Sequence, residues 1–365
     1  MSPSQAVNWA KLDTGSGTIT SANPGTGACS GWCTTSAYNL PSARSNFSLV
    51  AYNGFLYAIG GLDASGNRQS TIYIAKIGAN GEPQLWHPTN ADKSTWVYWY
   101  QDSGLSNTRS SLGAVAYNNR MYIVGGLTGT GTGSPVGTVQ IANINPNGTL
   151  GSWSSSSSLS SAVYGNDIQV YNDRIYVIGG ASSVGGAPRT NIYYSKINSD
   201  GSLNSWQSTT SLTSARMQPG GNFSVIWGAF LYVSGGCDTV NGSGYCTNVR
   251  SDTQVASINA DGSLDVWNTV GGVTDQRMGH SLFAWRDNIY EVGGCSAQNA
   301  STGDCTGILG TINYGTINQD GDASTVGATV DSSTAPCSTL YTDCNLPGTS
   351  YIGNMLDGAA ITNGY

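Results

Sequence analysis

Short apolar and aromatic runs recur along the chain, and each one ends in a pair of glycines. The five copies are "FLYAIGG" (55–61), "RMYIVGG" (120–126), "RIYVIGG" (174–180), "FLYVSGG" (230–236) and "NIYEVGG" (288–294). Runs of this length and composition, bounded by glycine, predict β-strands. A second apolar run precedes each copy, and Asn-Gly, Asn-Asn or Asn-Asp separates the two in the first three copies. These dipeptides predict tight hairpins, because both turn residues need a positive φ.

A third and a fourth strand are expected to follow in each unit. After a third run such as "NIYYSKIN" (191–198), the pattern Asn-x-Asp-Gly appears, then an apolar residue and a tryptophan, as in "KINSDGSLNSW" (196–206). The Asx side chains of such a turn bond nearby backbone, and its glycine takes the positive φ. We expect the tryptophan to lie in an outer strand and to cover neighbouring strands. Four antiparallel strands in a repeated unit predict a β-propeller.

The residues of the unit also carry a family resemblance. Paired glycines after an apolar strand, an aromatic residue just before them, a later tryptophan and an arginine ahead of the first strand resemble kelch repeats. The resemblance covers nearly the whole chain and implies an all-β, kelch-type propeller of four-stranded antiparallel blades. We expect one domain over 1–365, with five complete blades between 44 and 330.

The two ends of the chain predict an incomplete sixth blade. Residues 4–12, with Trp9, resemble an outer strand, and residues 354–365 resemble a first strand that stops at its hairpin turn. Each end also holds a cysteine-containing insertion, within 1–43 and 331–365. The kelch resemblance implies that strands from both ends close one blade, but the middle strands are missing here. The pattern favours a piece of a longer surface protein, with an open strand edge that self-associates.

Eight cysteines fall into four pairs of near neighbours: Cys29/Cys33, Cys237/Cys246, Cys295/Cys305 and Cys337/Cys344. Zinc is the competing interpretation, but there is no CxxC pair and the chain has only two histidines. We therefore predict four local disulfides and an oxidising compartment.

Charge and targeting signals narrow the setting further. Charged residues make up 10% of the chain, against ~25% in typical soluble proteins, and the net charge is −7 with four lysines. This balance argues against nucleic acid or an anionic membrane as a partner. No apolar run reaches the ~20 residues of a membrane span, and the first ten residues do not resemble a signal peptide. We expect an extracellular or cell-surface protein whose export signal lies outside this sequence.

Enzymatic chemistry finds little support in the sequence. Copper enzymes of the galactose oxidase type share the kelch pattern, and the resemblance implies two histidine ligands and a Cys–Tyr cross-link near the axis. His280 lies at the entry to a first strand, but His87 directly follows Trp86 and is expected at the periphery. Many acidic residues, such as Asp200 and Asp261, belong to the repeated turns, and no familiar catalytic motif is visible. We assign no catalytic residue, metal or cofactor.

Four units carry an arginine just before the first strand: Arg44, Arg109, Arg216 and Arg277. Kelch-like adaptor propellers that capture acidic peptides use arginines at this point, so the resemblance implies an acidic ligand at the axial mouth. A guanidinium group grips a carboxylate with two hydrogen bonds, and His280 would add a proton-dependent donor. The alternative is structural, because an arginine here can bond carbonyl groups of the next blade.

A second candidate surface lies in the segment "TWVYWYQ" (95–101). Its aromatic residues are Trp96, Tyr98, Trp99 and Tyr100. Aromatic rings stack on sugar faces and anchor protein interfaces, whereas the alternative is that this strand packs within the first blade.

Together these patterns favour a binding or adhesion module that uses a propeller face to hold a glycan or protein ligand, with an acidic ligand favoured by the arginines. The alternative is a propeller enzyme, a hydrolase or lyase, that acts on glycans.

Overall fold

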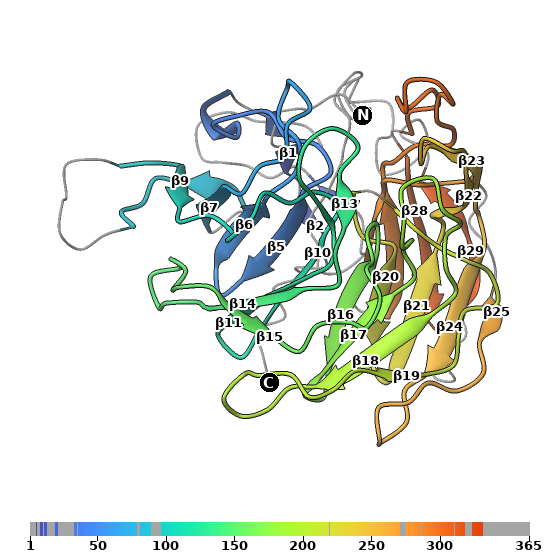
Figure 1. Cartoon of the computed structure of the whole chain (residues 1–365). Helices are drawn as coiled ribbons and strands as arrows, with labels where there is room; N and C mark the ends of the chain where they lie inside the picture. Colours follow the sequence, from blue (N-terminus) through green and yellow to red (C-terminus); the bar gives the residue numbers. More distant parts are fainter. Residues whose placement is uncertain are drawn as a thin grey trace.

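The computed structural model describes residues 36–78, 81–88, 96–218, 220–270, 275–285, 287–309, 311–317 and 323–330, with Gln5 and four short strands near the N-terminus. The described residues are almost entirely β-structure (Figure 1). Among the described residues, one 3₁₀ turn (Ser36–Tyr38) lies between the strands. None of the described helical segments is long and apolar enough to cross a membrane.

Five antiparallel sheets, which we call blades I to V in chain order, form the body of the protein. Blade I contains β5 (Ser48–Tyr52), β6 (Phe55–Ile59), β7 (Ile72–Ile77), β8 (Pro83–Gln84) and β9 (Trp99–Asp102). Blade II contains β10 (Gly113–Tyr117), β11 (Arg120–Val124), β14 (Val139–Asn143) and β15 (Ser154–Ser156). Blade III contains β16 (Asp167–Tyr171), β17 (Arg174–Ile178), β18 (Ile192–Lys196) and β19 (Gln207–Ser208).

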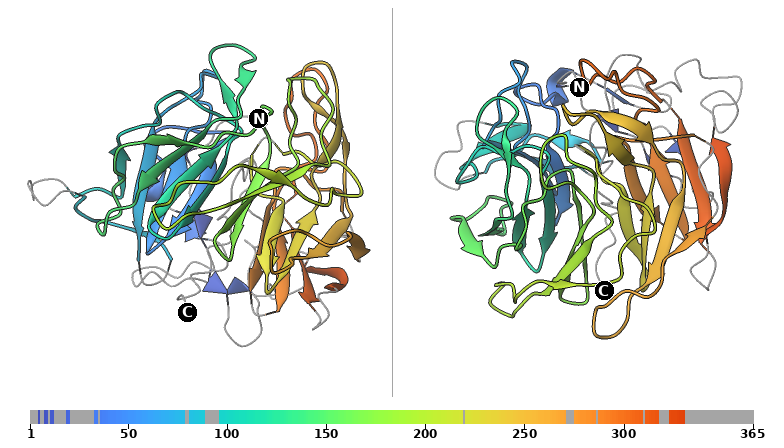
Figure 2. Two further views of the ribbon diagram at one scale, coloured as in Figure 1. Left: turned by 60° about the horizontal axis from the view of Figure 1, so that its bottom comes forward. Right: turned by 45° about the vertical axis from the view of Figure 1, so that its right-hand side comes forward.

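The last two blades follow the same order. Blade IV contains β20 (Ser224–Trp227), β21 (Phe230–Ser234), β24 (Thr253–Ser257) and β25 (Asn268–Val270). Blade V contains β26 (Ser281–Trp285), β27 (Asn288–Val292), β28 (Ile312–Ile317) and β29 (Ala323–Val330). The first strands β5, β10, β16, β20 and β26 pack side by side in sequence, and the blades fan out around them (Figure 2). The predicted all-β propeller with five blades is confirmed.

The prediction of an incomplete sixth blade concerns the chain ends. Trp9 belongs to β1 (Asn8–Trp9), which pairs with β4 (Cys33–Thr34), while β2 (Lys11–Leu12) pairs with β3 (Ile19–Thr20). Residues 331–365 lie outside the described residues, as does most of 1–35. Three statements therefore stay predictions: the incomplete sixth blade, its open strand edge, and a single domain over residues 1–365.

Apolar seams between neighbouring blades form the core. Ile123 of blade II packs in one cluster with Ile59 and Ile74 of blade I. The next seam joins Val124 of blade II to Val177 of blade III, because residues one apart on a strand face opposite neighbours. Burying a side chain of this size stabilises the fold by roughly 1.5–3 kcal/mol, so these seams hold the ring together.

The paired glycines fasten each blade to the next. Gly235 and Gly236 of blade IV have φ values of 59° and 82°, and a Cβ on Gly235 would lie 2.5 Å from the carbonyl oxygen of Arg277 in the following linker. The N–H of Gly236 donates to that same carbonyl (2.7 Å). The same bond recurs as Gly61 to Arg109 (2.8 Å), Gly126 to Val163 (2.8 Å) and Gly180 to Arg216 (2.7 Å). Two glycines are needed because the turn requires positive φ and the next blade leaves no room for a side chain.

The Asn-x-Asp-Gly turns fasten the blades at the opposite end. The hydroxyl of Tyr122 in blade II donates to the carbonyl of Gly201 in the turn of blade III (3.1 Å). Tyr176 bonds Gly262 in the same way (3.0 Å), and Tyr57 bonds Gly148 (2.9 Å) in the related Asn-x-Asn-Gly turn of blade II. The turn tryptophan lies just before the outer strand rather than in it, since Trp206 precedes β19 (Gln207–Ser208). It contacts the neighbouring blade, because Trp206 Nε1 donates to the carbonyl of Ser157 in the preceding linker (2.8 Å).

Candidate functional site

The loops that follow the glycine pairs lie on one face of the propeller, which we call the Gly-Gly face. The opposite face carries the hairpin turns and the Asn-x-Asp-Gly turns. Two of the loops form hairpins of their own, β12 (Leu127–Thr128) with β13 (Ser134–Pro135) and β22 (Cys237–Val240) with β23 (Cys246–Val249). Both rise at the top of Figure 1, away from the turns below. The five loops differ in length and sequence, whereas the strands beneath them repeat.

Neighbouring loops on the Gly-Gly face are hydrogen-bonded to one another. Arg68 of blade I donates to the carbonyls of Gly129 (3.2 Å), Gly131 (2.9 Å) and Thr132 (2.7 Å) in the loop of blade II. The loops of blades IV and V are joined in the same way. Asn241 donates to the carbonyl of Ala300 (2.7 Å), and the N–H of Cys246 donates to the Gln298 side chain (2.6 Å).

Disulfides and an apolar cluster stiffen these loops further. Cys237 is bonded to Cys246 and Cys295 to Cys305, as predicted. The other two predicted pairs, Cys29/Cys33 and Cys337/Cys344, lie outside the described residues apart from the backbone of Cys33. Beneath the loops, one cluster of buried residues runs from blade II to blade V: Leu127, Tyr164, Ala181, Met217, Cys237, Cys246, Val249, Met278 and Cys295. The Gly-Gly face is therefore a set of variable loops on a rigid base.

The four arginines before the first strands are buried, with between 0% and 4% of each residue exposed. Arg109 donates to the carbonyls of Gly125 (3.1 Å) and Thr138 (3.3 Å) and to the Thr138 hydroxyl (2.9 Å). Those acceptors belong to the same blade as Arg109. The structural alternative had predicted bonds to carbonyl groups of the next blade. Arg44 lies over the ring of Tyr73, with 5.0 Å between the guanidinium carbon and the ring centroid. The geometry gives these arginines a structural role, and their contact with an acidic ligand stays a prediction.

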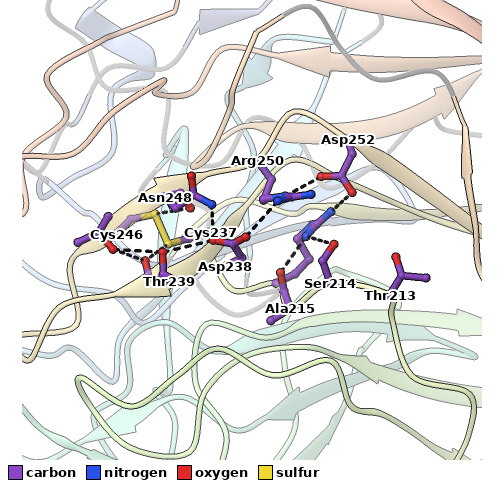
Figure 3. A network of polar contacts seen from close by, with 12 residues as sticks. Thr213, Ser214, Ala215, Cys237, Asp238, Thr239, Cys246, Asn248, Arg250 and Asp252 are labelled. Atoms are coloured by element: carbon purple, nitrogen blue, oxygen red, sulfur yellow. Dashed lines mark hydrogen bonds and ion pairs between the residues drawn. A yellow bond between two sulfur atoms is a disulfide. The ribbon is translucent and has the colours of Figure 1, made fainter.

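Arg216 belongs to a network of alternating charges whose outer member, Arg250, is partly exposed. Figure 3 shows Asp252, Arg250 and Asp238 of this network beside the Cys237–Cys246 disulfide. Arg216 lies 2.5 Å from Asp252, which accepts from Arg250 (2.8 Å), and Arg250 also pairs with Asp238 (3.2 Å) next to the Cys237–Cys246 disulfide. Burial disfavours the ionised form of Asp252. The hydrogen bond from Arg250 and the charge of Arg216 outweigh that effect and hold the pKa of Asp252 below its usual value. The network is balanced in charge and ties the disulfide hairpin to the blade.

His280 was expected to add a donor at the axial mouth, but its side chain is fully buried. Burial and the nearby charge of Arg277 lower the pKa of His280 to about 3. Its imidazole is therefore neutral at physiological pH in the folded protein. Within the described residues there is also no group of three or more His, Cys, Asp and Glu side chains that could hold a metal ion.

The aromatic segment of blade I is divided between the surface and the interior. Trp96 is 61% exposed and lies against the ring of His87, with 5.4 Å between centroids. Trp99 is 7% exposed and donates from Nε1 to the carbonyl of Tyr38 (2.8 Å). Tyr98 and Tyr100 are half-buried against Tyr38 and Trp86. Trp96 thus keeps the exposure that a stacking platform needs, whereas Trp99 packs within the blade.

Two buried acids were missed by the sequence analysis. Asp167 accepts hydrogen bonds from the N–H groups of Phe223 (2.8 Å) and Ser224 (2.7 Å) and from the Ser224 hydroxyl (2.8 Å). Burial nevertheless raises the pKa of Asp167 to about 6. Glu291 is 1% exposed and lies in the seam between blades IV and V. Its signal was visible in "NIYEVGG", where the other copies carry Ala, Ile, Val and Val at the same place.

Comparison with known proteins supports the fold. No protein-family model matches the chain. The Kelch repeat protein M-T8 of Myxoma virus (strain Lausanne) is 26% identical over 207 residues, which are 57% of this chain and 34% of that protein. The match thus spans about a third of the length of that curated relative. The solved structure of YjhT matches with a TM-score of 0.52 and 13% identity, over 75% of this chain and 80% of that one. The repeat pattern, the blade topology and these likenesses together identify the chain as a β-propeller built from kelch-type repeats.

Proposed function

We propose that the chain is an extracellular binding module that recognises a glycan or protein ligand with its Gly-Gly face. The observation that carries the proposal is the contrast between variable loops and the rigid base beneath them. Arg68 and Asn241 link neighbouring loops, and each of the two disulfides closes one loop, so few conformations are lost when a ligand binds. A preorganised surface loses less entropy on association, which favours affinity. The two disulfides also support an oxidising, extracellular setting.

The test is a blocking substitution on each face. Ser243 is exposed at the tip of the β22–β23 hairpin, and Ser199 is exposed in a turn on the opposite face. The labelled protein is applied to arrays of neutral glycans, acidic glycans and acidic peptides. We expect capture by one of these classes, at least tenfold weaker for Ser243→Trp and unchanged for Ser199→Trp.

Equal binding by both variants, with the fold intact, would exclude the tip of this hairpin from the binding surface. A complete lack of binding to all three probe classes would count against the proposal. Preference for the acidic probes would support the predicted acidic ligand. Release of new reducing ends or unsaturated sugars from the captured glycans would instead support the alternative, a glycan-acting hydrolase or lyase.

Trp96 offers a second, smaller surface at the edge of blade I. Its exposed ring is suited to stacking on a sugar face. On the same glycan array, Trp96→Ala should weaken binding if this platform contributes. The packed Trp99 is not a suitable control because its substitution disturbs the blade, so Leu85→Ala, another exposed apolar side chain of blade I, serves instead.

A further inference from the structure

At the position of Glu291 the seam between blades IV and V is polar, whereas the earlier seams carry an apolar residue at the corresponding position. Residues two apart on a strand face the same side. Ile289 of β27 packs against Tyr232 and Val255 of blade IV, so Glu291 faces blade IV as well. The corresponding residues of earlier blades, Ile123, Val177 and Val233, all pack in apolar clusters with the preceding blade. The chain has two glutamates, Glu82 and Glu291, and it buries one of them at this position.

The residues around Glu291 are polar too. The group that we call the IV–V seam consists of Ser234, Arg277, His280, Glu291 and Asn313, and each of them is at most 3% exposed. Asn313 is the direct strand partner of Glu291 in β28. The hydroxyl of Ser234 is bonded to Thr253 (2.7 Å) and is near enough to Glu291 to favour the ionised carboxylate. No described residue forms a hydrogen bond of normal geometry with either carboxylate oxygen of Glu291.

The charges at the seam do not balance when Glu291 is ionised. Arg277 Nε lies 3.7 Å from Glu291, and Arg277 Nη2 lies 3.7 Å from Asp275, which is on the surface side. The same guanidinium also donates to the carbonyls of Gly293 and Thr311 and to the Thr311 hydroxyl. His280 is neutral. One cation therefore faces two acids, and adding a proton to Glu291 leaves a single pair of opposite charges.

We propose that the IV–V seam is an internal proton-binding site, with Glu291 as the proton acceptor, and that proton binding strengthens the contact between blades IV and V. A neutral carboxyl group is accommodated in a low-dielectric seam far better than a carboxylate without hydrogen bonds. In agreement with this arrangement, burial raises the pKa of Glu291 to about 7, although the charge of Arg277 opposes the shift.

The seam also reaches the base of both disulfide loops. A Cβ on Gly235 would lie 2.8 Å from His280 Cε1, and one on Gly294 would lie 2.9 Å from His280 Cβ. Each glycine is followed within two residues by the first cysteine of a disulfide loop. Proton binding at Glu291 therefore acts at the root of the loops of blades IV and V. The inference stands whether or not the Gly-Gly face binds a ligand.

Because the chain holds two glutamates, labelling with [δ-¹³C]glutamate gives two carboxyl signals for NMR titration. The signal that disappears in Glu82→Gln identifies Glu82, and the other belongs to Glu291. We expect Glu291 to titrate with a midpoint near pH 7. A midpoint within about one unit of ~4.3, the value of an unperturbed glutamate, would overturn the proposal.

Unfolding in urea supplies the second measurement. The folded-state pKa of Glu291 lies above its unfolded value, so its contribution to stability falls as the pH rises from 4.5 to about 7. The difference in the free energy of unfolding between wild type and Glu291→Gln should change across this window. A constant difference for Glu291→Gln would contradict the proposal. If that variant does not fold, Glu291→Val matches the apolar seams and the wild-type titration still decides.

Discussion

The carbonyl oxygen of Arg277 accepts a hydrogen bond from Gly236 of the preceding blade, while the side chain of Arg277 is bonded within blade V. One residue thus joins two blades through different atoms. Val163 stands at the arginine position of blade III, and its carbonyl keeps the same bond, to Gly126. The backbone connection is independent of the side chain, so the arginine side chain has a separate task within its own blade.

That task predicts a large loss of stability on truncation. Arg109→Ala leaves the carbonyl group of Gly125 buried without its donor and removes the bonds to the carbonyl and hydroxyl of Thr138, whose carbonyl keeps the N–H of Gly125. An unpaired buried acceptor costs about 1–3 kcal/mol and each lost hydrogen bond about 1 kcal/mol, so we expect the free energy of unfolding to fall by about 2–4 kcal/mol. Urea unfolding followed by tryptophan fluorescence measures it. Arg120→Ala, at a half-exposed position, should change stability by less than about 1 kcal/mol, and an equal loss in both variants would disprove the structural role.

A glycine substitution can separate backbone strain from crowding. Gly235 and Gly228 have φ values of 59° and 58°, but only Gly235 is crowded, since nothing lies within 4 Å of a Cβ on Gly228. Gly228→Ala should cost about 1 kcal/mol for the positive φ alone, and Gly235→Ala should cost at least about 2 kcal/mol more. Thermal unfolding of the two variants provides the comparison. Similar losses would show that the next blade moves away easily.

Each hydrogen bond from a tyrosine hydroxyl to a turn glycine should contribute modestly to the free energy of unfolding. Tyr122→Phe removes the donor to Gly201 and should lower the free energy of unfolding by about 1 kcal/mol. Tyr193→Phe changes a half-buried tyrosine on β18 that has no described bond to a turn glycine. The control should be close to wild type in urea. A larger effect in Tyr193→Phe than in Tyr122→Phe would refute the importance of the turn bond.

The disulfides give a prediction for the loops. Replacing Cys295 and Cys305 by serine opens a loop of sequence separation 10 and should lower stability by about 2–3 kcal/mol. Calorimetry of the oxidised and substituted proteins measures the loss. Mass spectrometry of a digest under non-reducing conditions should also find the pairs Cys29–Cys33 and Cys337–Cys344. Free thiols at those four positions would contradict the sequence-based pairing.

Asp167 should make stability depend on pH. Its folded-state pKa of about 6 lies above the unfolded value of 3.8, so between these values the folded state binds more protons. The contribution of Asp167 to the free energy of unfolding therefore falls as the pH rises from about 4 to about 6. Asp167→Asn removes this dependence and also disturbs the bonds to Phe223 and Ser224, so it should be less stable at every pH. Parallel curves for both proteins would exclude the shift.

Much of the fold was predictable because the turns and the disulfide that determine it involve residues close together in sequence. The glycine pairs, the Asn-containing hairpins and the Cys237/Cys246 pair each specify a conformation within about ten residues. The role of the Arg109 side chain could not be predicted from the sequence, because the same sequence position suits an arginine that binds a ligand and one that bonds a backbone carbonyl. Trp96 and Trp99 lie three residues apart in an aromatic run, and only the packing of β9 against β7 and of Trp99 against Tyr38 separates the exposed ring from the buried one. Glu291 did differ from its counterparts in sequence. Its burial and its polar neighbours, however, depend on which blade the side chain faces, and the sequence alone does not show this.

The hydrogen bonds between blades determine which parts of the propeller can be exchanged for other sequences. The glycine–carbonyl bonds and the tyrosine–turn bonds connect strands, linkers and turns, and none of them uses a residue of the β22–β23 hairpin or of the loop that contains Cys295 and Cys305. A loop between the second and third strands can therefore be exchanged for another without breaking these bonds, although loop-to-loop bonds such as that from Asn241 to Ala300 would be lost. Whole blades are poor units of exchange by comparison, because every blade completes bonds that begin in its neighbour. The propeller would accept grafted loops more readily than transplanted repeats.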